Sequence, residues 1–118
     1  MKIAFLADPL SGFKIYKDST FAMMREAARR GHAIYHFEQR DMVLEEGVVS
    51  ARVARIHLTG DADDWYRVQP PRSAALADFG AVLMRKDPPF DSEYFYATHL
   101  LEQAERDGAR VFNKPRAL

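Results

Sequence analysis

Residues 3–9 read Ile-Ala-Phe-Leu-Ala-Asp-Pro, five apolar residues followed by an acidic residue and a proline. An unbroken apolar run that ends in a turn former is typical of a strand buried on both faces. After a loop over residues 10–17, Asp18-Ser19 offers an N-cap, and apolar residues then recur at helical spacing as far as Gly31. The start of the chain therefore predicts a buried strand that is followed by a helix.

The remainder of the chain alternates strands and helices in the same way. We expect a strand over residues 32–37 and then a hairpin over residues 42–54, which turns at Glu46-Gly47 and has an extension over residues 55–58. Further along the chain we expect a strand over residues 81–84, a helix from Asp91 or Ser92 to Gly108 and a strand over residues 109–112. Residues 59–73 are polar and contain prolines, so we expect the most mobile segment there, with Trp65 and Tyr66 as a local packing anchor.

This order of elements predicts an α/β fold, because strands that alternate with helices form a parallel sheet covered on both faces. We expect a Rossmann-like, mostly parallel sheet with helices on both faces and a β-hairpin insertion. A length of 118 residues suits one domain over residues 1–118, with a core that needs no disulfide or metal ion.

Composition excludes several functional classes. The chain has no cysteine, which excludes a disulfide scaffold, a cysteine zinc site, an iron–sulfur cluster and a thiol nucleophile. Its 17 basic and 17 acidic residues give no net charge, which argues against a nucleic-acid partner. No segment approaches the roughly 18–20 apolar residues of a membrane span, and the start lacks a signal-peptide pattern. We therefore expect a cytoplasmic protein without a membrane partner.

A binding site is expected where the strands end, because ligands of open α/β sheets bind beyond the carboxyl ends of the strands. The strand over residues 81–84 is followed by Arg85 and Lys86, and both predicted helices begin on the same edge. Helix N-termini carry positive partial charge, so this edge favours an anionic small ligand, most naturally one with carboxylates. Lys14 and Lys17 add further positive charge. Arg85 is the main candidate, since a guanidinium binds a carboxylate through two hydrogen bonds.

The alternative for Arg85 is a surface ion pair with Asp87 or Asp91. The prolines at 88 and 89 favour the binding role, because a rigid loop directly after a buried strand holds side chains in place.

Other candidate groups have weaker support. Ser19 fits an N-cap better than a nucleophile, because no nearby base is predicted for it. His36 and Glu38 share a strand face, but two groups do not make a metal site. The acidic run at residues 61–64 lacks the glycine and glutamate of a calcium loop, and no glycine-rich phosphate loop is present. We therefore expect no catalytic residue, metal ligand or nucleotide site in this chain.

Six strings of residues together resemble one protein family. They are Asp-Pro at 8–9, Lys-Asp-Ser-Thr-Phe-Ala-Met at 17–23, Arg-Gly-His at 30–32, Met-Arg-Lys-Asp-Pro-Pro-Phe-Asp at 84–91, Tyr-Ala-Thr at 96–98 and Asn-Lys-Pro at 113–115. Their identity and spacing resemble the N-terminal domain of bacterial glutathione synthetase over nearly the whole chain, and the string at 84–91 is the most specific.

The resemblance implies a three-domain enzyme of the ATP-grasp superfamily, which joins γ-glutamylcysteine to glycine with ATP and Mg²⁺. In this family the N-terminal, pre-ATP-grasp domain forms one wall of the dipeptide site, and the nucleotide and metal ions bind between the later domains. The resemblance further implies that Arg85 meets the γ-glutamyl carboxylate, that Ser19, Phe21 and Asp87 form the neighbouring wall, and that the full-length enzyme is a homo-oligomer. Since the chain stops at Leu118, we expect a fragment that binds no cofactor and is inactive alone.

Two alternatives come from other functional classes. A free-standing α/β module would use the same edge of the sheet for another anion. A subunit-assembly domain would pair the exposed edges of the hairpin at residues 42–54 between copies of the chain.

Overall fold

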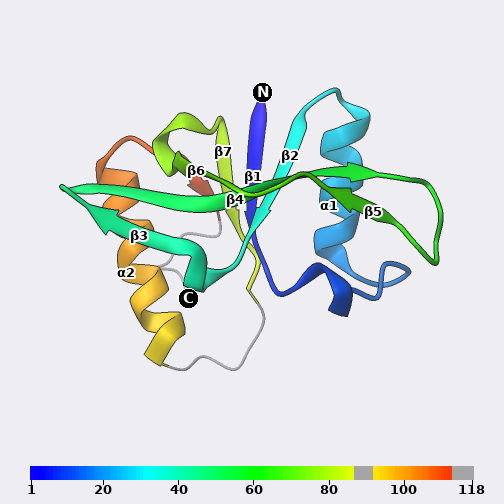
Figure 1. The fold of residues 1–118 in the computed structure, drawn as a ribbon, viewed down its shortest axis with the longest axis horizontal. Helices are drawn as coiled ribbons and strands as arrows, with labels where there is room; N and C mark the ends of the chain where they lie inside the picture. The colour runs from blue at the N-terminus through cyan, green and yellow to red at the C-terminus, as the bar shows by residue number, and fades with distance from the viewer. Residues whose placement is uncertain (87–91, 113–118) are drawn as a thin grey trace.

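The computed structural model of the chain describes residues 1–86 and 92–112 (Figure 1). The predicted di-proline loop and the last six residues lie outside this range. The elements, in chain order, are β1 (Lys2–Leu6), the 3-10 helix η1 (Leu10–Gly12), α1 (Ser19–Arg29), β2 (Ala33–Phe37), η2 (Gln39–Asp41), β3 (Met42–Glu45), β4 (Val48–Leu58), β5 (Tyr66–Val68), β6 (Arg72–Ala75), η3 (Leu76–Asp78), β7 (Ala81–Met84), α2 (Ser92–Arg106) and β8 (Val111–Phe112).

The strands form one mixed sheet with the order β3-β4-β2-β1-β7-β8. Strands β2, β1, β7 and β8 run parallel to one another, while β4 pairs antiparallel with β2, β3, β5 and β6. The predicted α/β fold and the hairpin insertion are confirmed. The expectation of a mostly parallel sheet is corrected, because the long strand β4 crosses the sheet and adds an antiparallel layer (Figure 1).

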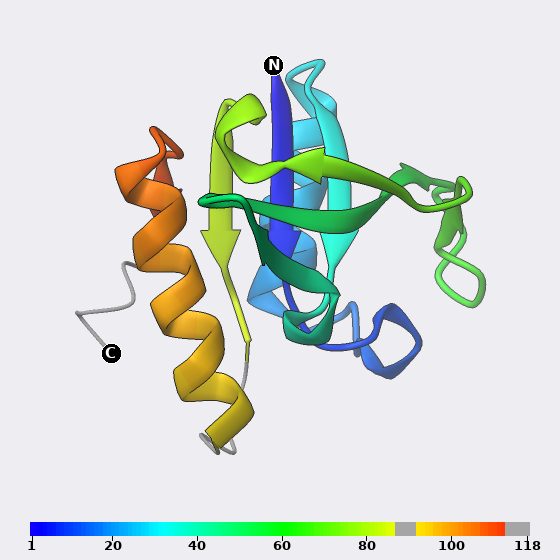
Figure 2. The ribbon, with the colours of Figure 1, turned by 60° about the vertical axis from the view of Figure 1, so that its left-hand side comes forward.

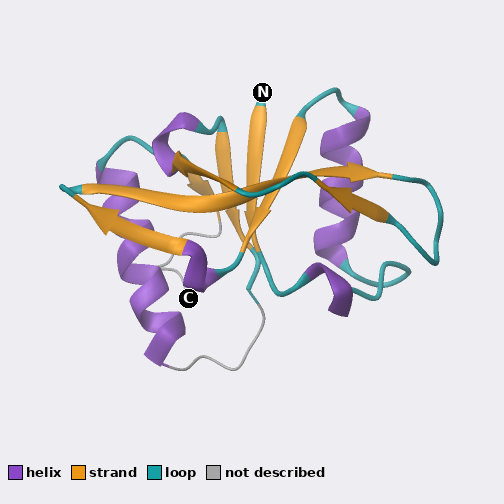
Figure 3. Cartoon of the chain, in the orientation of Figure 1, coloured by secondary structure: helices purple, strands orange, loops and turns teal. Residues whose placement is uncertain are grey.

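The two long helices cover opposite faces of the parallel strands (Figure 3). Side chains of a strand alternate between its faces, so Ala4 and Leu6 of β1 join the core under α2, whereas Phe5 joins the core under α1. This alternation is the reason that the first strand is apolar at every position from Ala4 to Leu6. Figure 2 shows the β3–β4 hairpin and α2 on the same side of the sheet, where they share one core.

Helix α1 begins and ends as its sequence predicts. Asp18 is the N-cap, and its carboxylate accepts hydrogen bonds from the backbone N–H groups of Thr20 (2.8 Å) and Phe21 (3.3 Å). The helix ends before Gly31, whose φ of +87° is a conformation that glycine adopts without steric cost. Within residues 1–86 and 92–112, no helix combines the length and the apolar character that a membrane crossing requires.

Residues 59–73 are more regular than the sequence predicts. They contain β5 and the first two residues of β6, and these strands pair with the two halves of β4. These strands are too short to show a period in the sequence, and they form because β4 is long enough to offer partners for their backbone groups. The predicted packing anchor is confirmed, since Trp65 is 8% exposed and its ring lies 5.5 Å from that of Phe13 and 5.1 Å from that of Phe21.

Truncation of Leu101 in α2 tests the core under this helix. Leu101 is fully buried, so we expect Leu101→Ala to lower the free energy of unfolding by about 2–5 kcal/mol in urea denaturation. The matched control is Leu44→Ala in β3, because Leu44 is 47% exposed and its loss is expected to change stability by about 0.5 kcal/mol or less. Equal losses for the two variants would contradict the placement of this core.

Candidate functional site

The carboxyl ends of β1 and β7 meet at the edge of the sheet where α1 and α2 begin (Figure 1). Arg85 directly follows β7, and its backbone N–H donates to the carbonyl of Leu6 at 2.8 Å. This bond continues the parallel ladder by one residue, so the position of Arg85 is fixed relative to the end of β1. The sequence prediction that both helices and Arg85 share one edge is confirmed.

The Arg85 side chain reaches the first turn of α1. Its Nη2 donates to the hydroxyl of Ser19 at 2.8 Å, and its Nε donates to the hydroxyl of Thr20 at 3.3 Å. The expected N-cap role of Ser19 is therefore wrong, because Asp18 caps the helix and leaves the Ser19 hydroxyl as an acceptor for the guanidinium. The alternative partners of Arg85, Asp87 and Asp91, lie outside the described residues.

Two adjoining cavities flank this first turn. One has a volume of about 340 Å³ and lies between Arg85 and the segment from Ala7 to Phe13. The other, also of about 340 Å³, is lined by Lys14 and Lys17, and both cavities share Gly12, Asp18 and Thr20 as lining residues. Arg85 lines the first cavity, and Lys14 and Lys17 line the second, each beside the N-terminus of α1 and each of a size that small-molecule ligands occupy. The lining carboxylates are already engaged, Asp18 by backbone N–H groups of α1 and Asp8 by Lys86. The arrangement suits an anion.

Asp8, which lines the Arg85 cavity, is held in place by polar contacts with neighbouring elements. The Lys86 ammonium lies 3.0 Å from the Asp8 carboxylate, and the Lys86 side chain is only 15% exposed. His36 donates from Nε2 to the main-chain carbonyl of Asp8 at 3.0 Å, since a carbonyl oxygen can only accept. The sequence predicts a strand for His36 but no role, because its partner, the carbonyl of Asp8, follows a different strand that is distant in the sequence.

Burial lowers the pKa of the His36 imidazole below its ordinary value of 6.5. The carbonyl groups of Asp8 and Ala7 and the charges of Glu38 and Asp41 act in the opposite direction and are outweighed. His36 is therefore neutral when the protein is folded at neutral pH, with its proton on Nε2.

Phe21, another of the predicted wall residues, lines neither of these two cavities. The Phe21 side chain points into the core under α1, where its ring packs edge-on against Trp65 and the Arg25 guanidinium lies 5.4 Å from its centre. Asp87 lies outside the described residues. Thr20, which sequence reasoning did not select, contacts the guanidinium instead.

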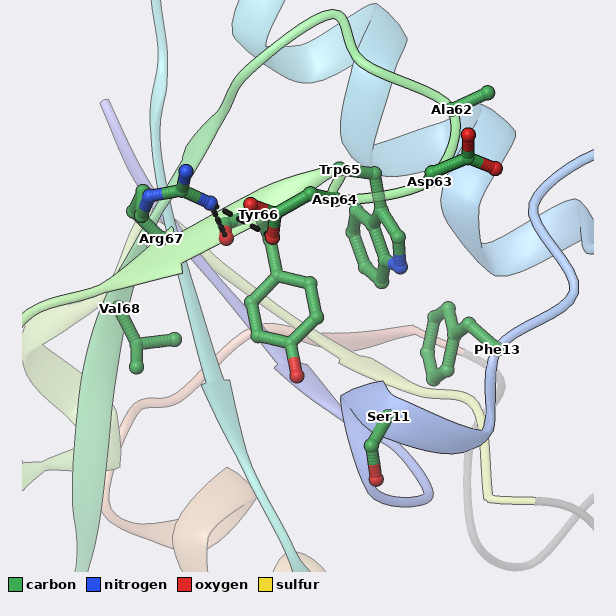
Figure 4. Close-up of a pocket in the computed structure, with 9 residues that line it drawn as sticks. All are labelled: Ser11, Phe13, Ala62, Asp63, Asp64, Trp65, Tyr66, Arg67 and Val68. Atoms are coloured by element: carbon green, nitrogen blue, oxygen red, sulfur yellow. Dashed lines mark hydrogen bonds and ion pairs between the residues drawn. The ribbon is translucent and has the colours of Figure 1, made fainter.

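A neighbouring open pocket is built around the Trp65 anchor (Figure 4). Figure 4 shows the rings of Phe13 and Trp65 facing one another above Ser11, and Ser11 and Phe13 also line the Arg85 cavity. The arginine of this pocket, Arg67, is paired with Asp64 at 2.9 Å. This pocket therefore adjoins the Arg85 cavity through Ser11 and Phe13, and it offers less positive charge to an anion because Arg67 is paired.

Comparison with known proteins gives a consistent result. Residues 1–118 match the family model described as "Prokaryotic glutathione synthetase, N-terminal domain". Three relatives that carry the name glutathione synthetase come from Ralstonia nicotianae (62% identical), Vibrio cholerae (47%) and Escherichia coli (42%), each over 118 residues. The alignments cover 100% of this chain and 36–37% of these relatives, so the chain spans a little more than one third of their length.

The buried imidazole predicts a pH dependence of stability. The unfolded chain takes up a proton at His36 near pH 6.5, whereas the folded chain resists it, so stability falls as the pH drops through 6.5 towards the lower pKa of the folded state. We expect the urea midpoint of the wild type to fall more between about pH 7.5 and about pH 5.5 than that of His36→Gln, which cannot titrate there. Equal decreases in the two proteins would contradict the burial of a neutral His36.

Proposed function

The chain belongs to the family of prokaryotic glutathione synthetase N-terminal domains, and we propose that it forms one wall of the dipeptide-substrate site in an ATP-dependent ligase. This enzyme joins γ-glutamylcysteine to glycine and produces glutathione. The 118 residues act as one substrate-binding domain of the longer enzyme. They are inactive alone, because they position a substrate and supply no group that makes or breaks a bond.

The observation that carries the proposal is the guanidinium of Arg85, held over the first turn of α1. Ser19 and Thr20 accept hydrogen bonds from Nη2 and Nε. A guanidinium carries five N–H donors, so Arg85 can bind these two hydroxyls and a substrate carboxylate at the same time. Lys14 and Lys17 line the adjoining cavity and extend the positive field around that carboxylate. In this arrangement Arg85 binds the γ-glutamyl carboxylate of the dipeptide.

The other predicted wall residues support Arg85 in different ways. The Ser19 hydroxyl orients the guanidinium and borders the cavity that Lys14 and Lys17 line. Phe21 holds the first turn of α1 in place through its N–H bond to Asp18 and its packing against Trp65. Asp87, two positions beyond Arg85 in the sequence, stays a predicted wall residue, and it lies outside the residues that the structure describes.

The described residues do not fit Mg²⁺ or ATP. Among residues 1–86 and 92–112, no three histidine, aspartate or glutamate side chains gather where they could hold a metal ion. The sequence also lacks a glycine-rich phosphate loop. The proposal assigns nucleotide and metal binding to the part of the longer enzyme that this chain does not cover, as the family resemblance implies. We further propose that the enzyme acts in the cytoplasm as a homo-oligomer without a membrane partner. The equal numbers of basic and acidic residues argue against a nucleic-acid partner.

Substitution of Arg85 tests the binding role in the full-length enzyme that carries this chain. Arg85→Ala is expected to raise the KM for γ-glutamylcysteine about tenfold or more, since a hydrogen bond to a charged group contributes roughly 1.5–3 kcal/mol. Arg85→Lys should recover only part of the loss, because an ammonium lacks the planar pair of donors. The control is Arg106→Ala near the end of α2, where the side chain bonds only to Gln103 among the described residues. An unchanged KM for Arg85→Ala would remove Arg85 from the site.

The division of labour between domains has its own test. The 118-residue chain, mixed with ATP, Mg²⁺, γ-glutamylcysteine and glycine, is expected to form no glutathione. The full-length enzyme should form glutathione under the same conditions, as measured by chromatography of the product. Turnover by the isolated chain would contradict the proposal that bond formation depends on the other domains.

A further inference from the structure

The segment Ala7-Asp8-Pro9 separates two cavities at the edge of the sheet. On the α1 side it lines the cavity of about 340 Å³ beside Arg85. On the α2 side the same three residues line a smaller cavity of about 200 Å³, together with Lys86 and Glu93. The course of this segment therefore shapes the wall of the Arg85 cavity. A small rotation of the peptide between Asp8 and Pro9 would move the proline ring into or out of that cavity.

Few backbone groups are available to fix this peptide. Strand β1 ends at Leu6, and the last backbone bond of this segment towards β2 is the one from the Ala7 N–H to the Phe37 carbonyl, at 3.2 Å. Pro9 has no N–H group, so the Asp8–Pro9 peptide can be held only through its carbonyl oxygen. The imidazole of His36 donates to that oxygen at 3.0 Å, from the neighbouring strand β2.

His36 acts on the peptide from behind the wall. It is 9% exposed and is not among the described residues that line either cavity. Its lowered pKa is consistent with a neutral ring that carries its proton on the nitrogen facing Asp8. The Asp8 side chain is held independently by the ion pair with Lys86 at 3.0 Å, so His36 controls the main chain and Lys86 controls the carboxylate.

We propose that His36 is a positioning residue of the dipeptide site, which holds the Asp8–Pro9 peptide in the orientation that shapes the cavity beside Arg85. This inference rests on the proposed function of that cavity. His36 does not line the cavity, so we expect it to act on substrate binding through its hydrogen bond to the Asp8 carbonyl.

The test compares two substitutions of His36 in the full-length enzyme. His36→Leu removes the donor with little change in volume, and we expect the KM for γ-glutamylcysteine to rise about three- to tenfold, the size of one hydrogen bond, while the KM for ATP stays unchanged. His36→Gln places an amide N–H near the position of Nε2, so its KM for the dipeptide should stay within about twofold of the wild type. Equal increases for Leu and Gln, or an unchanged KM for Leu, would overturn the proposal.

Stability needs separate control, because His36 is also part of the core. Val53→Ala, in a buried position of β4, should lower the melting temperature and leave the KM for the dipeptide unchanged. Should the leucine variant fail to fold, His36→Asn replaces it, since the shorter amide does not reach the carbonyl and should raise KM where Gln does not. A wild-type enzyme that forms no glutathione would overturn the proposed function itself, whereas an active enzyme indifferent to these substitutions would overturn only the role of His36.

Discussion

The parallel pairing of β1 with β7 is the constraint on which the rest of the site depends. Leu6 and Met84 are partners in register, and the bond from the Arg85 N–H to the Leu6 carbonyl extends that register by one residue. Two backbone segments far apart in sequence are thereby joined at the point where both leave the sheet. Because each strand is buried between two helices, this point cannot shift without disturbing the cores under α1 and α2.

Side chains at this edge of the sheet bind backbone N–H and carbonyl groups that have no partner within a helix or strand. The first turn of α1 has backbone N–H groups without helical partners, and the Asp18 carboxylate accepts two of them. Asp18 thereby leaves the hydroxyls of Ser19 and Thr20 to the Arg85 guanidinium. On the other side, His36 satisfies the carbonyl of Asp8. One edge of the sheet therefore combines a fixed cation, a helix N-terminus and a tethered wall, which are the features that a carboxylate site needs.

Sequence reasoning reached the fold class and the position of Arg85 at the edge of the sheet because both follow from local patterns. The apolar run of β1 and the helical spacing in α1 are periodic, and the residue after a parallel strand lies at the carboxyl edge in every such sheet. Strands β5 and β6 were missed because their stability comes from pairing with β4 rather than from their own composition. The helical spacing of α1 includes Phe21, but the packing of its ring against Trp65 and the bond of His36 to Asp8 involve partners distant in sequence, so no local pattern reports these two contacts.

A crystal structure of the full-length enzyme with γ-glutamylcysteine bound would show whether Arg85 binds the dipeptide. We expect a carboxylate of the dipeptide within hydrogen-bonding distance of the Arg85 guanidinium, between the first turn of α1 and the segment that contains Asp8 and Pro9. A dipeptide bound elsewhere, with only Ser19 and Thr20 on the Arg85 guanidinium, would contradict the proposed role of Arg85.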